Sequence, residues 1–392
     1  MINPSYQSSV LQLNNFLEGG ISRYSATRNF DNGPNDRTNV SFLSPFIRKR
    51  ILHEKFVLES ALNKFNYNKI EKFIQEVFWR TYWKGWLEGR KSVWEDYKSS
   101  LKKIKCNLSE VDSNNLKNVY EANTGIECLD CWIDELKNIG YLHNHSRMWF
   151  ASLWIFTLKL PWELGADFFL KYLLDGDPAS NTLSWKWVAG LQTQGKAYVA
   201  QENNIDKFTN HRFSQKNYCE KNIEIPIFKS YSYEGHSFSN DQISENDNFL
   251  INQNNLIYDQ QFLNQIKKCN VLFYQLDQEI KFSQLVSKFN ENAVDSYIEY
   301  LETKGVNVTK LNGKEKLNEF VSHSQQKKIL TMYPAVGYEL DSIKKIESET
   351  GIIFNFIYDE YDRMCWIHSK AGFFKFKSHI MKFLKDLNLI NS

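Results

Sequence analysis

The chain has 392 residues, a length that favours two domains over one, and a net charge of only +2. No uncharged apolar run reaches 18 residues, which excludes a membrane-spanning helix. The first ten residues, MINPSYQSSV, lack the basic and apolar regions of a signal peptide, so we expect a cytoplasmic protein.

Basic and aromatic residues are concentrated in the first half of the chain. Residues 41–105 contain 15 Lys and Arg against 7 Asp and Glu, and most of the 11 Trp precede residue 190. A basic face suits a polyanion, and flat rings at this density suit stacking on a cofactor or on bases. A solvated charged surface and an aromatic core without ligands are the alternatives.

The six cysteines are scattered along the sequence. Cys128 and Cys131 form a CxxC pair, but no second pair accompanies it. We therefore expect reduced thiols, and we predict neither a metal site nor an iron–sulfur cluster.

Residues 47–104 predict helices, with an interruption at Gly85 and Gly89. Within this region Glu76 and Trp79 are three residues apart and share one helix face. A carboxylate beside an indole can accept a hydrogen bond from a pyrimidine N–H while the ring stacks on the base. The alternative is a structural helix with one core Trp.

Further along, two apolar helical runs, 149–160 and 164–174, are separated by Pro161. Arg147 precedes them, and the acidic turn DGDPASN (175–181) follows them. An Arg and two Asp that bracket packed aromatic helices must pair with one another or bind a charged ligand. A structural ion pair in an all-helical core is the simpler alternative.

After a polar, weakly periodic stretch, strand and helix signals alternate. The expected strands are 270–274, 306–309, 328–333 and 352–358, and helices are expected to end near 304 and to span 317–324 and 338–350. This alternation predicts a parallel sheet with right-handed crossovers. A GxGxxG fingerprint is missing from the sequence.

These patterns predict an all-α domain over 1–218, a linker over 219–262, and a smaller α/β domain over 263–392 with a doubly wound parallel sheet. Residues 195–213, at the end of the first domain, are expected to have a structural role only.

An ordered series of rare residues lies between 141 and 187. Tyr141-Leu142-His143-Asn144-His145-Ser146-Arg147-Met148 is followed by Trp162, by Asp175-Gly176-Asp177-Pro178-Ala179-Ser180-Asn181, and by Trp185 and Trp187. This series resembles the WxHNRxRM, DGDxAxN and WxW pattern of the flavin-binding core of the DNA photolyase and cryptochrome family. The resemblance extends with gaps over roughly the first 215 residues.

Four other segments resemble the same family. Tyr24–Asn29 resembles a segment whose Tyr touches the flavin phosphates. Residues 40–45 resemble the TSxLSP phosphate clasp, with Val40 in place of Thr. Residues 75–80 resemble ExxWR, and residues 123–130 resemble TGxPxxD, with Glu127 in place of Pro. The segment 372–383 is similar to the YxVFTPFxxxW stretch that leads from the family's sheet domain to its flavin domain. Because the sheet here follows the helices, we expect a circularly permuted family member; an unrelated α/β domain fused downstream is the alternative.

The resemblance implies an all-α FAD-binding domain and a lesion pocket within it. Glu76, Trp79, Asn144, Met148 and Trp187 would grip a flipped-out pyrimidine dimer, with Glu76 bonding a base and the two Trp stacking on it. Asn144 and Met148 favour the cyclobutane dimer, since enzymes for the (6-4) photoproduct typically carry His at both positions.

The FAD itself would be held by a second set of residues. The resemblance assigns this role to Tyr24, Ser41, Leu43, Ser44, Arg80, Arg147, Asp175, Asp177 and Asn181, with Arg147 and Asp175 paired and Asn181 at the flavin N5. It implies an electron relay through Trp185 and Trp162. The outermost relay position falls on Ser109, so either Trp94 or Tyr120 substitutes for it or the relay leaves by another route.

The function that this resemblance implies is light-driven repair of cyclobutane pyrimidine dimers in UV-damaged DNA by a deoxyribodipyrimidine photolyase. An antenna chromophore of unknown identity is a possible second cofactor, and we expect a monomer. A blue-light-sensing cryptochrome without repair activity and a non-catalytic nucleic-acid binder are the alternatives.

Overall fold

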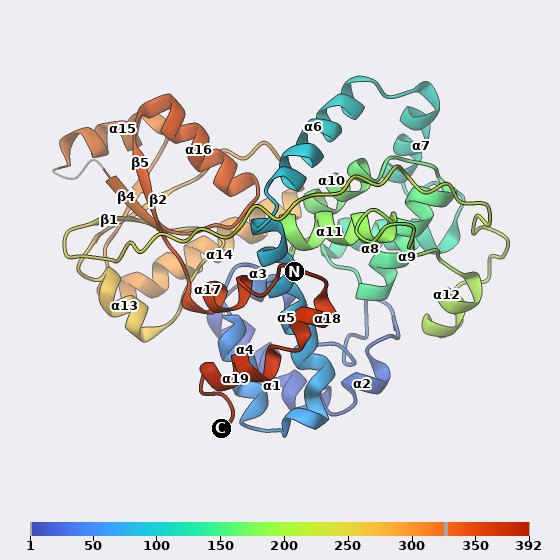
Figure 1. Cartoon of the computed structure of the whole chain (residues 1–392), viewed down its shortest axis with the longest axis horizontal. Coiled ribbons are helices and arrows are strands. Elements are labelled where there is room, and N and C mark those ends of the chain that lie inside the picture. Colours follow the sequence, from blue (N-terminus) through green and yellow to red (C-terminus); the bar gives the residue numbers. More distant parts are fainter. Residues whose placement is uncertain (1, 325–327, 392) are drawn as a thin grey trace.

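The computed structural model describes residues 2–324 and 328–391. Met1 and Ser392, the outer ends of the two predicted domains, lie outside this range. Helices fill the first part of the chain, and a five-stranded sheet follows it, as predicted. Figure 1 shows the sheet on one side of the molecule and most helices on the other, with α5 between them.

The helical part contains twelve α-helices and one π-helical turn. They are α1 (Tyr6–Gly19), α2 (Tyr24–Thr27), α3 (Ser44–Arg48), α4 (Glu54–Leu62), α5 (Tyr67–Glu88), α6 (Ser92–Cys106), α7 (Glu110–Tyr120), α8 (Glu127–Ile139), α9 (Asn144–Ser152), η1 (Leu153–Thr157), α10 (Trp162–Tyr172), α11 (Pro178–Val188) and α12 (Glu202–Phe208). Among the described residues, none of the helices has the length and apolar character needed to cross a membrane.

Helix α5 is the central element of the helical part. Its buried side chains include Phe73, Val77 and Phe78, and the helix packs against α2, α4 and α11. The predicted interruption is confirmed at Gly89, the C-cap of α5, but it is wrong at Gly85, because the helix continues to Glu88. A glycine within a helix is tolerated where a side chain has no room, and a Cβ at Gly85 would lie 2.7 Å from the ring of Trp366.

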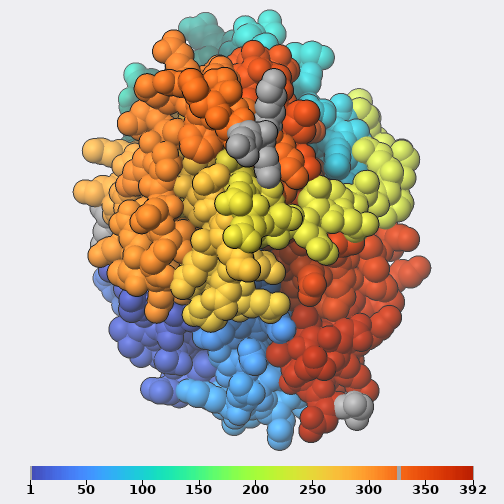
Figure 2. Space-filling model, turned by 90° about the vertical axis from the view of Figure 1, so that its left-hand side faces the viewer, coloured from blue at the N-terminus to red at the C-terminus, as the bar shows by residue number. Residues whose placement is uncertain are grey.

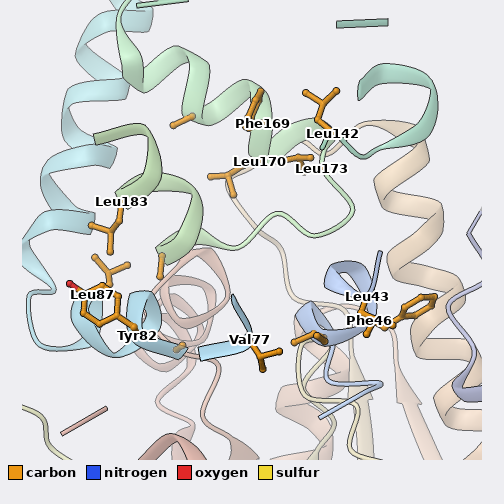
Figure 3. Close-up of a cluster of buried hydrophobic side chains, with 14 of the residues drawn as sticks. Leu43, Phe46, Val77, Tyr82, Leu87, Leu142, Phe169, Leu170, Leu173 and Leu183 are labelled. Carbon is orange, nitrogen blue, oxygen red and sulfur yellow. The ribbon is translucent and has the colours of Figure 1, made fainter. Parts of the chain in front are cut away.

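The two apolar runs form the predicted pair of helices. Helix α9 continues into η1, the chain turns at Pro161, and α10 begins at Trp162. Helix α10 packs along α11. Figure 3 shows Phe169 and Leu170 of α10, Leu173 just after it and Leu183 of α11 in one core, which also includes residues of α3 and α5.

The sheet has the order β3-β2-β1-β4-β5, and every neighbouring pair of strands is parallel. This confirms the doubly wound arrangement. Its strands are β1 (Asn248–Leu250), β2 (Asn270–Tyr274), β3 (Val308–Leu311), β4 (Lys328–Met332) and β5 (Ile353–Ile357). Helices α13 (Gln260–Ile266) and α14 (Gln284–Thr303) share one apolar cluster with the sheet, and α15 (Lys314–His323) and α16 (Tyr338–Thr350) share the other.

The central strand corrects the predicted domain boundaries. Strand β1 and the start of α13 lie inside 219–262, the range expected to be a linker. Only three residues form β1, and a polar run follows them, so the strand signal is short. The extended part of the connection ends near residue 247. Figure 1 shows it passing from α12 across the helices to the sheet.

The last part of the chain returns to the helical part. Helices α17 (Glu360–Trp366), α18 (Phe373–Lys377) and α19 (Ile380–Asp386) follow β5, and α17 and α18 pack on α5. Arg50, between α3 and α4, also donates to Asp362 of α17 at 2.6 Å. Figure 2 shows the C-terminal residues beside the N-terminal helices. This placement of the sheet and its closing segment is consistent with a permuted chain order.

The contact between α10 and α11 predicts a strong effect of one added methyl group. A Cβ at Gly165 would lie 2.2 Å from the Trp185 ring, so we expect Gly165→Ala to lower the free energy of unfolding by about 1–3 kcal/mol. Gly19→Ala is the matched control, since Gly19 ends α1 with open space around it, and alanine there should be neutral or stabilising by less than about 1 kcal/mol. Urea unfolding measures both variants; equal effects would contradict the assigned contact.

Candidate functional site

The turn 175–181 joins α10 to α11 and is buried at both aspartates. Asp177 caps α11, because its Oδ1 accepts from the Ser180 N–H at 2.7 Å. Asn181, on the first turn of α11, donates its Nδ2–H to the Ala166 carbonyl at 2.8 Å. These two local bonds fix the shape of the turn.

Asp175 pairs with Arg147 across the turn. The Arg147 Nη2 lies 2.9 Å from Asp175 Oδ2, and Arg147 Nε donates to the Leu142 carbonyl. Burial acts to raise the pKa of Asp175, but the charges of Arg147 and Arg80 hold it below its usual range. The other oxygen, Oδ1, is buried without a hydrogen-bond partner among the described residues. The carboxylate therefore keeps one acceptor free.

Asp177 is balanced by a second arginine, Arg48, which the sequence analysis did not identify. Arg48 Nε donates to the Gly176 carbonyl at 2.8 Å and lies 3.9 Å from Asp177 Oδ2. Burial opposes ionisation of Asp177, and Arg48 and Arg80 lower its pKa nevertheless. Arg48 is the last residue of α3, whose first residue is Ser44, and this proximity to the expected phosphate clasp was the available signal.

Four of the expected phosphate-binding residues lie in or just before the two short helices α2 and α3, and the fifth, Arg80, lies on α5. Leu43 is the N-cap of α3, and the Ser41 carbonyl accepts from Gln12 Nε2 at 2.9 Å. Tyr24, in α2, packs edge-on against Phe16 and Phe73. Ser44 lies close enough to Asp175 to lower the pKa of that carboxyl. The structure thus brings the start of α3 to the acidic turn.

On α5, Glu76 and Trp79 both have partners from distant parts of the chain. Glu76 Oε1 lies 2.5 Å from Arg28 Nη1, and the two side chains are 30% and 27% exposed. Burial raises the pKa of Glu76 even though Arg28 opposes this effect. The Trp79 ring stacks on Phe373 of α18, with centroids 3.5 Å apart and planes 11° from parallel. Arg28 and Phe373 are further residues that the sequence analysis did not assign to the site.

The start of α9 carries the other expected lesion contacts. Asn144 is exposed, and Met148 follows one turn later, half-buried. His143 links this helix to Arg28: its Nδ1 accepts from the His145 N–H, so its Nε2–H donates to the Arg28 carbonyl at 3.0 Å. The elements that carry Asn144 and Glu76 are therefore joined through Arg28.

Trp187 lies on α11, which packs against both α5 and α9. Its ring stacks on Tyr198 with centroids 5.6 Å apart. His145, where the family pattern has Arg, points its ring towards Trp149 and Phe208. Contacts with Trp149, a core residue, draw the imidazole away from the solvent.

The two aromatic residues expected in the relay belong to separate groups of neighbouring rings. Trp185 is buried beside Phe169 and Trp154. The ring centroids of Trp162 and Tyr97 are 5.7 Å apart, and those of Tyr97 and Trp94 are 5.2 Å apart. Tyr120 instead contacts Phe168. Ser109 is exposed as the N-cap of α7. Of the two substitutes considered for it, Trp94 is the one connected to Trp162 through a ring.

Two cavities lie where the helices meet the sheet. A cavity of about 30 Å³, enough for one water, is lined by Arg48, Asp177 and the loop 334–339 at the carboxyl ends of the strands. An open groove of about 960 Å³ lies between α4, α13 and the segment after β5. The small cavity cannot admit a dinucleotide, so ligand binding at the acidic turn requires side chains to move.

The comparisons with known proteins concern the region that carries this site. Residues 73–224 match the family model described as FAD binding domain of DNA photolyase. The chain is 28% identical over 198 residues to a deoxyribodipyrimidine photo-lyase of Alkalihalophilus pseudofirmus, a match covering 49% of this chain and 39% of that protein. It is 24% identical over 221 residues to Cryptochrome-1 of Arabidopsis thaliana, covering 54% and 31%.

Among solved structures, a bacterial class III photolyase from Agrobacterium tumefaciens aligns with a TM-score of 0.44 and 26% identity, over 53% of this chain and 43% of that one. The chain therefore spans less than half the length of these curated relatives.

The donor set at the acidic turn fits FAD. Asp175 Oδ1 and Ser180 Oγ are buried and lack hydrogen-bond partners among the described residues, and a ligand with N–H and hydroxyl groups would satisfy them. Arg48 and Arg80 supply positive charge for phosphates. Within residues 2–324 and 328–391, His, Cys, Asp and Glu form no group of three or more that could hold a metal ion.

The burial of His143 predicts a dependence of stability on pH. Burial lowers the pKa of His143 from 6.5 to about 3, so the unfolded chain binds a proton between these values that the folded chain does not. The free energy of unfolding should therefore decrease as pH falls from 6.5 towards 3, and less steeply in His143→Asn. Urea unfolding at a series of pH values measures these slopes. His211→Asn, at an exposed site, should retain the wild-type slope; a wild-type slope in His143→Asn would contradict the assignment.

Proposed function

Since the chain belongs to the DNA photolyase and cryptochrome family, whose FAD-binding domain it carries over residues 73–224, we propose that it is a deoxyribodipyrimidine photolyase that repairs cyclobutane pyrimidine dimers in DNA with light. The observation that carries this proposal is the charged turn. Two buried aspartates, paired with Arg147 and Arg48, keep an unsatisfied acceptor in the helical core.

Bound FAD would supply the single electron that dimer cleavage needs and that no side chain can donate. Tyr24, Ser41, Leu43, Ser44 and Arg80 would bind its phosphates and Arg147, Asp175, Asp177 and Asn181 its ring and ribityl chain. The Arg147–Asp175 pair, with only 3% of the Asp175 side chain exposed, would exclude water from the ring.

Glu76 would hold the lesion by accepting a hydrogen bond from a pyrimidine N–H. Its carboxylate is kept oriented by Arg28 at 2.5 Å, and burial raises its pKa. A carboxyl group with a raised pKa binds and releases a proton more readily near neutral pH, which suits a residue that faces a base whose charge changes.

Trp79 and Trp187 would stack on the flipped bases. Flipping costs a few kcal/mol, least at a damaged site, and stacking contributes about 1–3 kcal/mol per base. Two indoles are thus sufficient to offset the cost of flipping. Asn144 and Met148, one turn apart on α9, would line the same pocket, and neither residue is the acid that (6-4) repair requires.

The open groove is where we place the possible second chromophore. It is lined by the aromatic side chains of Phe56, Tyr258, Phe262 and Tyr361, among polar groups. The hydroxyl of Tyr258 is buried without a partner among the described residues. A flat heterocycle with polar edges suits such a lining.

A blue-light sensor without repair activity is the alternative function, because the relatives include a cryptochrome. Both functions require FAD, so its absorption bands in the purified or reconstituted protein test the shared part. Loss of thymine dimers from irradiated DNA under blue light, but not in the dark, then separates repair from sensing.

The lesion pocket predicts the effect of two substitutions. Trp79→Ala should weaken binding of a dimer-containing oligonucleotide about tenfold or more, because a stacking surface is lost. Glu76→Ala should lower the yield of repair, and both variants should retain FAD. Trp86→Ala, on the same helix but packed on Arg90, is the control and should repair normally. Full repair by both pocket variants would show that the lesion binds elsewhere.

The relay predicts a separate phenotype. We propose Trp185 and Trp162 as its inner members and Trp94, which contacts Trp162 through the ring of Tyr97, as its outer member. The Trp94 Nε1–H donates a hydrogen bond to Asp341 at 2.8 Å. Trp94→Phe should slow light-driven reduction of the flavin, followed by absorption, while chemically reduced protein repairs at the normal rate. Tyr120→Phe should leave both rates unchanged. A slower photoreduction in Tyr120→Phe alone would assign the exit to that residue.

A further inference from the structure

Two hydrogen bonds fasten the segment 370–373 to α5 and to the residues just after it, one from Tyr82 of the helix and one from Arg90, which follows its C-cap. Tyr82 donates its hydroxyl to the Ala371 carbonyl at 2.9 Å, and Arg90 donates to the Lys370 carbonyl at 2.7 Å. The segment therefore enters α18 at a fixed place beside α5, although about 290 residues separate the two in sequence.

Phe373, the first residue of α18, lies flat on Trp79. The ring centroids are 3.5 Å apart and the planes 11° from parallel. Phe373 is itself only 6% exposed and also touches Tyr82 edge-on, at 5.5 Å. If Phe373 only covered the face of Trp79 that binds a base, the side of the Phe373 ring away from Trp79 would be exposed to solvent. Phe373 is instead part of the core, where it contacts the buried rings of Tyr82 and Phe376, so Trp79 rests one face on a core residue.

We propose that Phe373 is a positioning residue that holds the Trp79 indole as a preformed platform for a nucleobase. The inference rests on the proposed function and adds that the segment after the sheet completes the nucleobase site. An indole supported on one face occupies fewer rotamers before binding. Less conformational entropy is then lost when a base stacks on its other face. The covered face also limits Trp79 to one base.

The test compares Phe373→Leu, which keeps an apolar side chain but removes the flat ring, with Phe373→Tyr, which keeps the ring. We expect Phe373→Leu to bind a dimer-containing oligonucleotide about fivefold more weakly, with unchanged affinity for the undamaged oligonucleotide. Phe373→Tyr should bind as the wild type does. Phe356→Leu, which alters a half-buried ring of β5, is the matched control and should change neither affinity.

A second measurement needs neither DNA nor FAD. In protein labelled with 5-fluorotryptophan, the ¹⁹F resonance of Trp79, assigned through Trp79→Phe, should shift and broaden in Phe373→Leu but not in Phe356→Leu. The proposal is overturned if this resonance is unchanged, if damaged-DNA affinity is unchanged, or if it increases, since an increase means that Phe373 competes with the base. A wild-type protein that does not prefer damaged DNA refutes the proposed function instead, and the ¹⁹F result distinguishes the two failures.

Discussion

The buried carboxylates of Asp175 and Asp177 impose the constraint on which the rest of the structure depends. A buried charge is costly unless it is paired and hydrogen-bonded. The partners come from different helices: Arg147 from α9, Arg48 from α3, and Arg80 from α5. Pairing these charges therefore requires the helices to converge on the turn between α10 and α11. The same convergence places the remaining candidate residues around that turn.

The contacts of α5 extend this arrangement to the sheet. Glu88, at the end of the helix, accepts from the Tyr333 hydroxyl at 2.9 Å and from the Val336 N–H at 2.6 Å. One face of α5 thus bears the candidate lesion residues, and its C-terminal end anchors the loop that follows β4. The sheet is held in place by buried polar groups as well as by apolar packing, and such groups specify one geometry more strictly than apolar contacts do.

The sequence predicts the elements whose period and boundaries are unambiguous. Helix α16 begins at Tyr338 and ends at Thr350 as expected, because Gly337 and Gly351 flank an amphipathic run. Strand β2 coincides with its predicted range for a similar reason. The sequence does not predict strand β1, because three residues are too few for a periodic signal. It does not predict that the helix continues through Gly85, because glycine is needed there for close packing against Trp366, which is distant in the sequence. The motif also indicated the acidic turn and Arg147. It could not indicate Arg28 or Phe373, since contacts across 48 and 294 positions leave no local pattern.

The return of α17–α19 to α5 has a consequence for synthesis of the protein on the ribosome. The N-terminal helices emerge first, yet the surface of α5 that Phe373, Phe376 and Tyr361 cover lacks these partners until the segment 361–376 has been translated. Contacts between such distant residues form slowly, and exposed aromatic surface promotes association with other chains in the meantime. The aromatic surface of α5 therefore stays without its native partners while the whole sheet is synthesised, which is the interval in which shielding by a chaperone would matter most.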